Sequence, residues 1–387
     1  MSEIGIASNS MDISEQRRRL LEYLLDEEDD FGSSEEDTIS RREDRTEAPL
    51  SFAQQRLWLL DQLEPGNPAY NIPFAIRLTG ALDFEALERS LNEIIRRHEV
   101  LRTSFVVRHA QPVQVIEADA RLTLEVTDLR GLEASARAAD LERIIKEEAL
   151  ERFDLGRGPL IRARLVRESG REQVLLLTIH HIAGDGWSIG VFVQELGRLY
   201  EAYSKGEESP LEELQIQYGD YAFWQRTRQG EELERQLEYW KKELHGAPTV
   251  LDLPTDRPRP ALRSYRGATQ TIRLSRSLSE ALKQECRREG ATMFMLLLAG
   301  FNALLMRYSG QEDILVGTPI ANRTRAEIEG LIGYFANTLV IRTDLTGDPS
   351  FRELVRRVKD STLGAYDHQD VPFETIVREL AVERDES

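Results

Sequence analysis

The chain has one cysteine, no long apolar run and no cluster of basic residues, and each absence excludes a class of protein. A single cysteine, Cys286, among 387 residues excludes an internal disulfide framework and suits a reducing cytoplasm. No apolar stretch is long enough to span a bilayer, and residues 1–10 lack the basic-then-apolar order of a signal peptide. Basic side chains are nowhere clustered. We therefore expect a cytoplasmic protein that binds neither a membrane nor nucleic acid.

Acidic residues, in contrast, are abundant, and half of the net negative charge lies near the N-terminus. The formal net charge is −18, and residues 1–47 carry −9 of it, most densely at Asp26–Asp30. Such a segment cannot bury enough apolar surface to fold alone, so residues 1–47 are predicted to be a mobile linker. Within this linker, leucines recur at helical spacing in residues 13–25. That stretch is either a short docking helix for a partner protein or a linker helix that packs on its own chain.

The remainder of the chain alternates between helix-like and strand-like stretches, which predicts an α/β fold. A length of 387 residues, 41% hydrophobic and 30% charged, fits a globular protein of two domains or two lobes. A proline-rich stretch, residues 253–260, interrupts the alternation and is typical of an inter-lobe connection. We therefore expect an N-terminal lobe over residues 48–252 and a C-terminal lobe over residues 253–387. The elements expected in the second lobe include a strand over Thr269–Leu274.

Two adjacent histidines followed by an aspartate-glycine turn form the most informative pattern of the chain. A strand-like run, residues 174–179, leads into His180 and His181, and Asp185 and Gly186 follow. Successive side chains of a strand point to opposite faces, so one imidazole should be packed and the other should face a pocket. This argues against a metal site formed by the pair. Asp185 could orient an imidazole or pair with a distant arginine, and the Gly186 N–H could approach a reacting oxygen. The alternative is a pair of satisfied core histidines beside a turn.

The run His180–Ser188 resembles the HHxxxDG signature of condensation domains of non-ribosomal peptide synthetases. Five further segments resemble the other motifs of this family in the family's order, namely Ser51–Trp58, Arg97–Phe105, Tyr218–Trp224, Ile332–Thr338 and His368–Glu374. Six spaced motifs over residues 50–374 make this a specific match. Both histidines of the signature are present. The residues of the motifs resemble those of the condensation domains that join an L-configured donor to an L-configured acceptor.

The resemblance implies a fold and a reaction. The fold would be two lobes, each resembling chloramphenicol acetyltransferase, in a V-shaped arrangement with a central substrate tunnel. An upstream donor and a downstream acceptor peptidyl carrier protein would each insert a phosphopantetheine arm. The acceptor's α-amine would attack the donor thioester and form a peptide bond. No metal or directly bound cofactor is implied, and an adenylation domain is the expected neighbour.

The resemblance also gives roles to individual residues. His181 matches the family's second histidine and would be catalytic. It would either remove a proton from the attacking amine or position that amine and stabilise the tetrahedral intermediate. The Gly186 N–H would be an oxyanion donor. Asp185 would be structural and paired with Arg102, and His180 would be packed beneath the tunnel.

Three further residues lie in the supporting motifs. Asn337 could hydrogen-bond a substrate amide or bridge the two lobes. Trp224 is expected to pack in the core or between lobes rather than contact the substrate. His98 ends a predicted amphipathic helix over residues 84–98 and is expected to be a surface or capping residue.

Other interpretations remain open at this stage. The last motif of the family begins Arg-Asp-x-Ser, and the chain stops at Arg384-Asp385-Glu386-Ser387, so we expect the C-terminal lobe to be truncated. The His-x-x-x-Asp-Gly pattern also occurs in coenzyme A-dependent acyltransferases, which gives a second candidate function. A non-catalytic platform for docking carrier proteins is a third candidate, against which the intact His181 argues.

Overall fold

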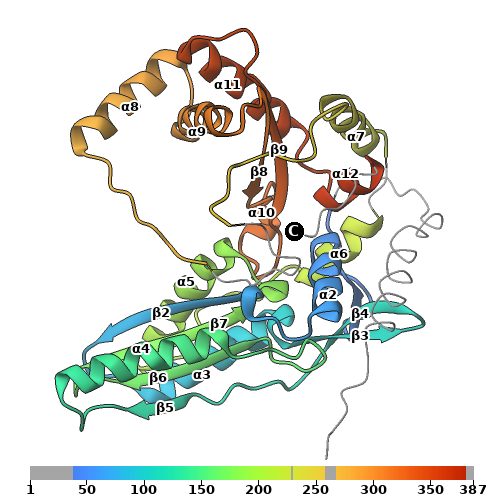
Figure 1. Cartoon of the computed structure of the whole chain (residues 1–387). Coiled ribbons are helices and arrows are strands. Elements are labelled where there is room, and N and C mark those ends of the chain that lie inside the picture. The colour runs from blue at the N-terminus through green and yellow to red at the C-terminus, as the bar shows by residue number, and fades with distance from the viewer. Residues whose placement is uncertain (1–37, 228–229, 258–266, 381–387) are drawn as a thin grey trace, which may run out of the picture. The chain divides into compact units, whose positions relative to one another are not determined.

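The chain folds into two compact units in the computed structural model, which describes residues 38–227, 230–257 and 267–380 (Figure 1). Unit 1 contains the described residues up to Thr227 together with Arg323–Ala336, which we call the return segment. Unit 2 contains the described residues from Gly230 to Asn322 and from Asn337 onward. The chain therefore leaves unit 1, enters unit 2, returns once to unit 1 and ends in unit 2.

This division differs from the expected boundary between residues 252 and 253. Helix α7 (Glu231–Glu243) belongs to unit 2 because Trp240 is fully buried in the apolar core of that unit. The return segment belongs to unit 1 because Ile328, Leu331 and Phe335 join the core there. Burial of apolar side chains, rather than the proline-rich stretch, decides where the units divide.

Six α-helices and three short 3-10 helices are described in unit 1. The α-helices are α2 (Phe52–Leu63), α3 (Phe84–Arg97), α4 (Ala134–Leu150), α5 (Gly186–Tyr203), α6 (Tyr218–Thr227) and α10 (Ala326–Glu329). The 3-10 helices are η1 (Pro68–Tyr70), η2 (Glu99–Arg102) and η3 (His181–Ala183). Side-chain caps fix where the helices begin: Ser51, Asp83 and Asp185 each accept a backbone N–H of the first turn, at α2, α3 and α5 respectively.

The main sheet of unit 1 places the paired histidines. Its strands lie in the order β2 (Asn71–Thr79), β7 (Glu172–His180), β6 (Ile161–Arg167) and β5 (Glu125–Asp128). β7 is antiparallel to both of its neighbours, and every residue of β7 after its first is buried. Leu175 and Leu177 join the core with apolar residues of α3 and α5, whereas Val174 and Leu176 pack with Ile144 of α4. Because the strand is covered on both faces, it reads as a continuous apolar run.

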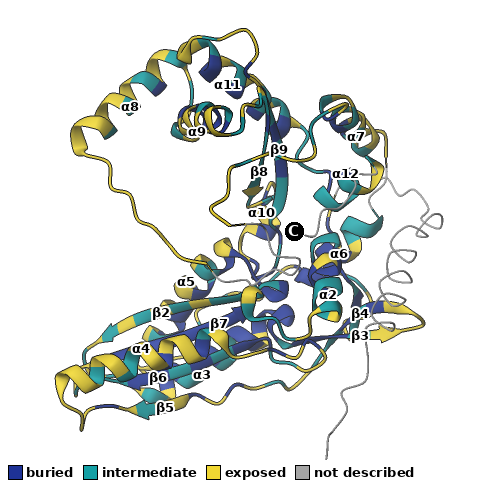
Figure 2. Ribbon diagram, viewed as in Figure 1, coloured by how far each residue is buried: buried dark blue, intermediate teal, exposed yellow. Residues whose placement is uncertain are grey.

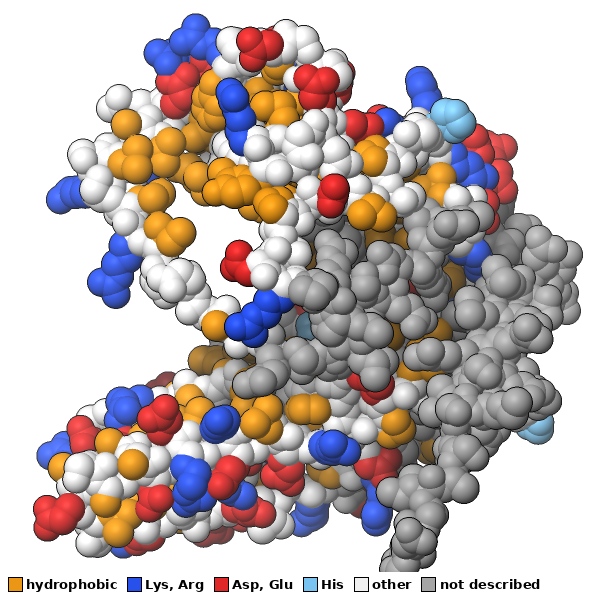
Figure 3. Space-filling model, viewed as in Figure 1, with side chains coloured by type: hydrophobic (Ala, Val, Ile, Leu, Met, Phe, Trp, Pro, Cys, Tyr) orange, Lys and Arg blue, Asp and Glu red, His pale blue; other side chains and the backbone are white. Residues whose placement is uncertain are grey.

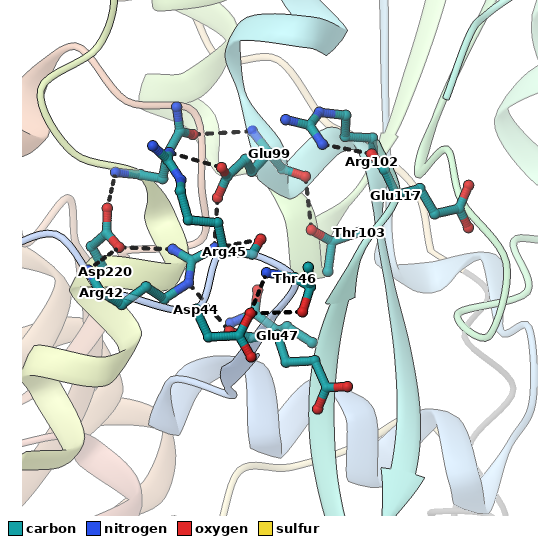
Figure 4. Close-up of polar contacts among 12 residues, drawn as sticks. Arg42, Asp44, Arg45, Thr46, Glu47, Glu99, Arg102, Thr103, Glu117 and Asp220 are labelled. Atoms are coloured by element: carbon teal, nitrogen blue, oxygen red, sulfur yellow. Dashed lines mark hydrogen bonds and ion pairs between the residues drawn. The ribbon is translucent and has the colours of Figure 1, made fainter. Parts of the chain in front are cut away.

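A second sheet of unit 1 is linked to the segment that precedes the core. Its three strands are antiparallel, in the order β1 (Glu47–Pro49), β4 (Gln111–Ile116) and β3 (Thr103–Arg108). The prediction of a mobile linker up to residue 47 is wrong for residues 38–47. Ile39 is buried, and Arg42 makes ion pairs with Glu99 at 2.7 Å and Asp220 at 2.8 Å (Figure 4). The buried carboxylates of Glu99 and Asp220 need a cation, and Arg42 supplies it. These two ion pairs therefore hold residues 38–47 against the rest of unit 1. The possible docking helix of residues 13–25 lies outside the described residues.

In the described part of unit 2, five helices pack around a two-stranded sheet. Strands β8 (Asp313–Ile320) and β9 (Asn337–Asp344) are antiparallel. The helices are α7, α8 (Arg276–Glu289), α9 (Met293–Ser309), α11 (Phe351–Asp367) and α12 (Phe373–Glu379). The core gathers the inner side chains of these elements, among them Ala299, Leu339 and Val358, all fully buried.

The expected strand over Thr269–Leu274 is absent, because no strand of the described residues pairs with this segment. It has no regular secondary structure, and Ile272 is 82% exposed (Figure 2). A strand needs the hydrogen bonds of a neighbour to satisfy its backbone. In the same unit, α9 leaves an apolar stripe exposed, and Figure 3 shows apolar side chains gathered in this region. The stripe consists of Phe294, Leu297, Phe301, Leu304 and Tyr308.

Among the described residues, no single helix has the length and apolar character needed to cross a membrane. The pair α8 and α9 meets that test only when the two are taken together across a bend of 102°.

Candidate functional site

The paired histidines lie where β7 gives way to α5. The strand ends at His180, and His181 starts the 3-10 turn η3. Gly184 is extended, Asp185 caps α5, and Gly186 is the first residue of that helix. The motif is therefore a strand end, a single tight turn and a helix N-terminus in direct succession, which we call the histidine loop (residues 180–188).

His180 is packed inside unit 1, as predicted. It is 3% exposed, its Nδ1 accepts the N–H of Ile182 at 3.2 Å, and its ring lies against the rings of Tyr70 and Phe153. Desolvation, reinforced by nearby positive charge, lowers the pKa of His180 to about 3. His180 is therefore a neutral packing residue near neutral pH.

His181 is partly exposed and differs sharply from its neighbour. Its ring lies edge-to-face on the ring of Tyr334, with the two centroids 4.7 Å apart and the planes at 65°. Its Nδ1 is buried, and among the described residues no hydrogen-bond partner reaches that atom. The alternating exposure expected of the two histidines is thus observed.

Asp185 is buried and bound on both carboxylate oxygens. Oδ1 accepts the backbone N–H of Ser188 at 2.9 Å and lies 3.3 Å from Nη2 of Arg323, while Oδ2 accepts the N–H of Phe335 at 3.1 Å. Burial lowers the pKa of the Arg323 guanidinium, and the charge of Asp185 opposes that shift. Asp185 thus ties the histidine loop to the return segment.

The expected pairing of Asp185 with Arg102 is wrong. Arg102 donates to the carbonyl oxygen of Glu117 at 2.5 Å and to that of Arg96 at 3.4 Å (Figure 4). Arg323, which replaces it, lies 138 residues from Asp185 in sequence. It also donates to two carbonyls of its own segment, those of Ile328 and Leu331. Arg323 could have been identified only from a contact between two segments that are distant in sequence. The spacing of residues within a motif contains no information about such a contact.

The return segment is bound both to the histidine loop and to α6. Ser188 Oγ accepts the N–H of Gly333 at 3.1 Å and lies 3.0 Å from the carbonyl oxygen of the same residue. The hydroxyl of Tyr218 donates to the carbonyl of Tyr334 at 2.6 Å and contacts Ser51 Oγ at 2.8 Å. A Cβ placed on Gly333 would lie 2.0 Å from the Tyr218 ring, so only glycine allows this approach.

His98 is a second buried histidine of unit 1, and its predicted surface position is wrong. It caps the end of α3, as expected, but is only 1% exposed. Its Nδ1 accepts the N–H of Ile332 at 3.2 Å, and its Nε2 lies 3.0 Å from a carboxylate oxygen of Glu195. Because Nδ1 accepts, Nε2 carries the proton and donates to Glu195. His98 thus adds a further bond between the return segment and the rest of unit 1.

Gly186 and the residues after it border an open groove. No atom lies within 4 Å of a Cβ built on Gly186, and a groove of about 800 Å³ is lined by residues of α5 and its neighbours. Trp187 forms part of the wall, and its indole N–H donates to the carbonyl of Glu329 at 2.9 Å. The first N–H groups of a helix have no partner within the helix, so the backbone at Gly186 can donate to an incoming oxygen.

Asn337 and Trp224 have structural partners. The side-chain amide of Asn337 donates to the carbonyls of Gln369 and Val371, and its oxygen accepts the N–H of Phe373, all within unit 2. Both amide hydrogens of Asn337 are therefore used by backbone carbonyls. Trp224 lies against the ring of Tyr221 and beneath the guanidinium of Arg325.

In the described part of the chain, no three histidine, cysteine, aspartate or glutamate side chains lie close enough together to hold a metal ion.

Comparison with known proteins agrees with this geometry. The family profile described as Condensation domain matches residues 44–387. A linear gramicidin synthase of Brevibacillus parabrevis is 53% identical over 337 residues, which are 87% of this chain and 6% of that protein. The X-domain from teicoplanin biosynthesis superposes with a TM-score of 0.82 at 32% identity, covering 90% of this chain and 77% of the other. The first condensation domain of the calcium-dependent antibiotic synthetase gives 0.70 at 25% identity, covering 86% and 78%.

The fold is thus that of an α/β protein of the condensation-domain type, as the sequence predicted. The chain belongs to the condensation-domain family, and its relatives are non-ribosomal peptide synthetases. Condensation domains of these synthetases catalyse amide bond formation and work on substrates held by the phosphopantetheine arms of carrier proteins. The chain spans only 6% of the length of the gramicidin synthase that it matches.

Proposed function

We propose that this chain forms a peptide bond between a donor aminoacyl or peptidyl thioester and the α-amine of an acceptor aminoacyl thioester. The amine attacks the thioester carbon and the C–N bond forms, which places negative charge on the carbonyl oxygen. When that intermediate collapses, the C–S bond breaks and the ammonium proton passes to the leaving thiolate. The products are an amide on the acceptor arm and a free thiol on the donor arm.

His181 is the catalytic residue in this proposal. A histidine that acts as a general base gains a proton, and both of its ring nitrogens then carry hydrogen. In His181 that form would bury an Nδ1–H for which no acceptor lies within reach among the described residues. The unpartnered Nδ1 therefore supports the second of the two roles expected of His181. In this role the Nε2–H of His181 donates a hydrogen bond to the oxygen of the tetrahedral intermediate.

The remaining residues of the histidine loop support that step. The Gly186 N–H, at the N-terminus of α5 beside open space, is the second donor proposed for the oxyanion. Asp185 is assigned to holding the loop, because both of its oxygens are occupied by protein donors. His180 is assigned to packing, since it is neutral near pH 7 and enclosed by aromatic rings.

The setting proposed for the reaction follows the family. Upstream donor and downstream acceptor carrier proteins would bring their phosphopantetheine arms to the histidine loop, and an adenylation domain of the same synthetase would load the acceptor carrier. The resemblance of the motifs supports the class of domains that join an L-donor to an L-acceptor, and the proposed compartment is the cytoplasm. No cofactor bound directly to the chain is part of this proposal.

The direct test is formation of a dipeptide between two loaded carrier proteins. Mass spectrometry of the acceptor carrier should show dipeptidyl product with the unaltered chain and at least about 100-fold less with His181→Ala. His109→Asn is the matched control, because His109 is exposed in a hairpin turn at φ 51°, which asparagine tolerates.

Full activity of a folded His181→Ala variant would contradict the assignment of His181. Equal use of free coenzyme A thioesters as donors would instead favour a coenzyme A-dependent acyltransferase. Carrier binding without turnover would indicate a docking platform.

A further inference from the structure

The orientation of the His181 imidazole lacks the usual restraint. In catalytic histidines of the triad type, the second ring nitrogen bonds a carboxylate or carbonyl, and that bond fixes how the ring lies. Within the described part of the chain, Nδ1 of His181 has no such partner although it is buried. Some other contact therefore has to orient this ring.

The ring of Tyr334 makes that contact. Its centroid lies 4.7 Å from that of His181, with the planes at 65°, which is an edge-to-face arrangement. Such aromatic pairs contribute about 0.5–1.5 kcal/mol beyond their buried area and have a preferred geometry. Tyr334 is only partly buried and does not belong to the set of fully buried core residues. Its ring therefore contributes less to the core of unit 1 than Phe335, which is 2% exposed.

The backbone that carries Tyr334 is fixed to the same loop that carries His181. Gly333 N–H is bound to Ser188 Oγ at 3.1 Å, and Phe335 N–H is bound to Asp185 Oδ2 at 3.1 Å. Between them, the carbonyl of Tyr334 accepts the buried hydroxyl of Tyr218 at 2.6 Å. Three consecutive residues of the return segment are thus held, two of them by residues 185 and 188 of the histidine loop. The position of the Tyr334 ring relative to His181 is consequently set by short-range bonds.

We propose that Tyr334 is a positioning residue for the reaction, and that its ring takes the part that a hydrogen bond to Nδ1 plays in other catalytic histidines. The ring confines the imidazole to one orientation, in which Nε2 meets the substrate. This proposal rests on the catalytic role proposed for His181. It assigns the effect to the aromatic ring and not to the phenol hydroxyl.

The first test compares three substitutions. Tyr334→Phe keeps the ring and should stay within about two-fold of the unaltered chain in kcat. Tyr334→Ala removes the ring and should lower kcat on the order of 10- to 100-fold, with little change in KM for the loaded acceptor carrier, because misorientation acts on the reacting geometry. Tyr334→Leu fills most of the space without a planar ring and should behave as Tyr334→Ala, which separates the ring from simple loss of packing.

The second test repeats Tyr334→Ala in a His181→Ala background. If the ring acts through His181, its removal has no further effect once the imidazole is gone. A loss of kcat by the same factor in both backgrounds would assign Tyr334 a general structural role and overturn the proposal. A loss in Tyr334→Phe as large as in Tyr334→Ala would also overturn it, since the hydroxyl would then be the active group.

A third measurement does not depend on turnover. With ¹³C-labelled histidine, the ring resonance of His181 is identified by its disappearance in His181→Ala. Tyr334→Ala and Tyr334→Leu should shift this resonance, whereas Tyr334→Phe should leave it near its original position. An unchanged resonance in all three variants would contradict the proposal even if peptide bond formation is observed. A shifted resonance in a chain that forms no peptide bond would instead contradict the function proposed above and leave the contact established.

Discussion

The chemistry of the adjacent histidines is decided by what each ring nitrogen meets. His180 has its Nδ1 bound to a backbone N–H and its ring enclosed, and its pKa of about 3 keeps it neutral. Among the described residues no partner reaches the buried Nδ1 of His181, and its ring packs edge-to-face on that of Tyr334. Two identical side chains one residue apart thus serve different ends because His180 is the buried last residue of β7, whereas His181 begins the turn η3.

His180 should make the protein less stable in acid. In the unfolded chain its imidazole binds a proton near pH 6.5, whereas in the folded chain the pKa is about 3. Between these values the unfolded state holds more protons, so the free energy of unfolding falls by up to about 1.4 kcal/mol per pH unit as the pH decreases. His180→Asn keeps an acceptor for the Ile182 N–H but does not titrate. Urea unfolding at pH 7, 6, 5 and 4 should show a steeper loss for the unaltered chain than for His180→Asn, and parallel losses would rule this out.

The pairing of Asp185 with Arg323 can be tested against the pairing expected from the sequence. Asp185→Asn and Arg323→Met should each cost about 3–5 kcal/mol, since each leaves a buried group uncompensated. The double variant should cost much less than the sum, because the two partners are removed together. Asp185→Asn combined with Arg102→Met should be additive to within about 0.5 kcal/mol. Chemical denaturation of the six proteins measures both cycles, and coupling to Arg102 instead of Arg323 would contradict the observed geometry.

At the scale of single residues, the sequence pattern predicts features that depend on neighbouring residues in the chain. Strand alternation predicted that one of the two histidines is packed, and the resemblance assigned that place to His180. Helix periodicity placed His98 at a helix end. What could not be predicted is contact between residues far apart in sequence. The partners of Asp185 and His98 include Arg323 and Ile332, both in the return segment. The resemblance suggested an arginine from a nearby motif, but the fold supplies one from a segment more than a hundred residues later.

At the scale of elements, the return segment approaches α6 and the histidine loop at a position where only glycine fits. Gly333→Ala would place a Cβ 2.0 Å from the Tyr218 ring, so either the ring or the backbone has to move. We expect a loss of about 2 kcal/mol or more, as for other overpacked core positions, and a fall in activity through displacement of Tyr334. Gly197→Ala is the matched control, because it lies in α5 with open space around it and should stabilise the helix by about 0.5–1 kcal/mol. Thermal unfolding should move the melting temperature in opposite directions, and a fall for both variants would contradict this account.

Strands were harder to predict than helices for a physical reason. A helix such as α3 satisfies its own backbone, and its cap at Asp83 and apolar face are both local. A strand is satisfied only by its neighbour, so the alternating pattern of Thr269–Leu274 is compatible with a strand but does not produce one where no described strand pairs with it. β7, which has a partner on each side, forms as its apolar run predicts.

Among the described residues, the two largest apolar cores of the molecule, one in each unit, share no residue. The core of unit 1 includes Ile328, Leu331 and Phe335, although the chain on both sides of these residues belongs to unit 2. Sequence order predicts a single crossing between two consecutive lobes. The fold instead interleaves them, because the apolar residues of the return segment are buried only against unit 1. The family motif at Ile332–Thr338 spans the third crossing, between Ala336 and Asn337.

This organisation predicts which parts of the chain lose protection together. Leu339 and Leu165 are both fully buried, one in each core, and replacing either with alanine should cost about 2–5 kcal/mol. Amide hydrogen exchange after Leu339→Ala should accelerate in β8, β9 and α11, while the amides of Ile332, Gly333 and Phe335 keep their protection. Leu165→Ala should have the reverse effect, because those three amides are bonded to residues of unit 1. If the return segment instead exchanged together with its sequence neighbours in unit 2, its bonds to His98, Ser188 and Asp185 would not be what holds it. The proposed positioning of His181 by Tyr334 would then lose its structural basis.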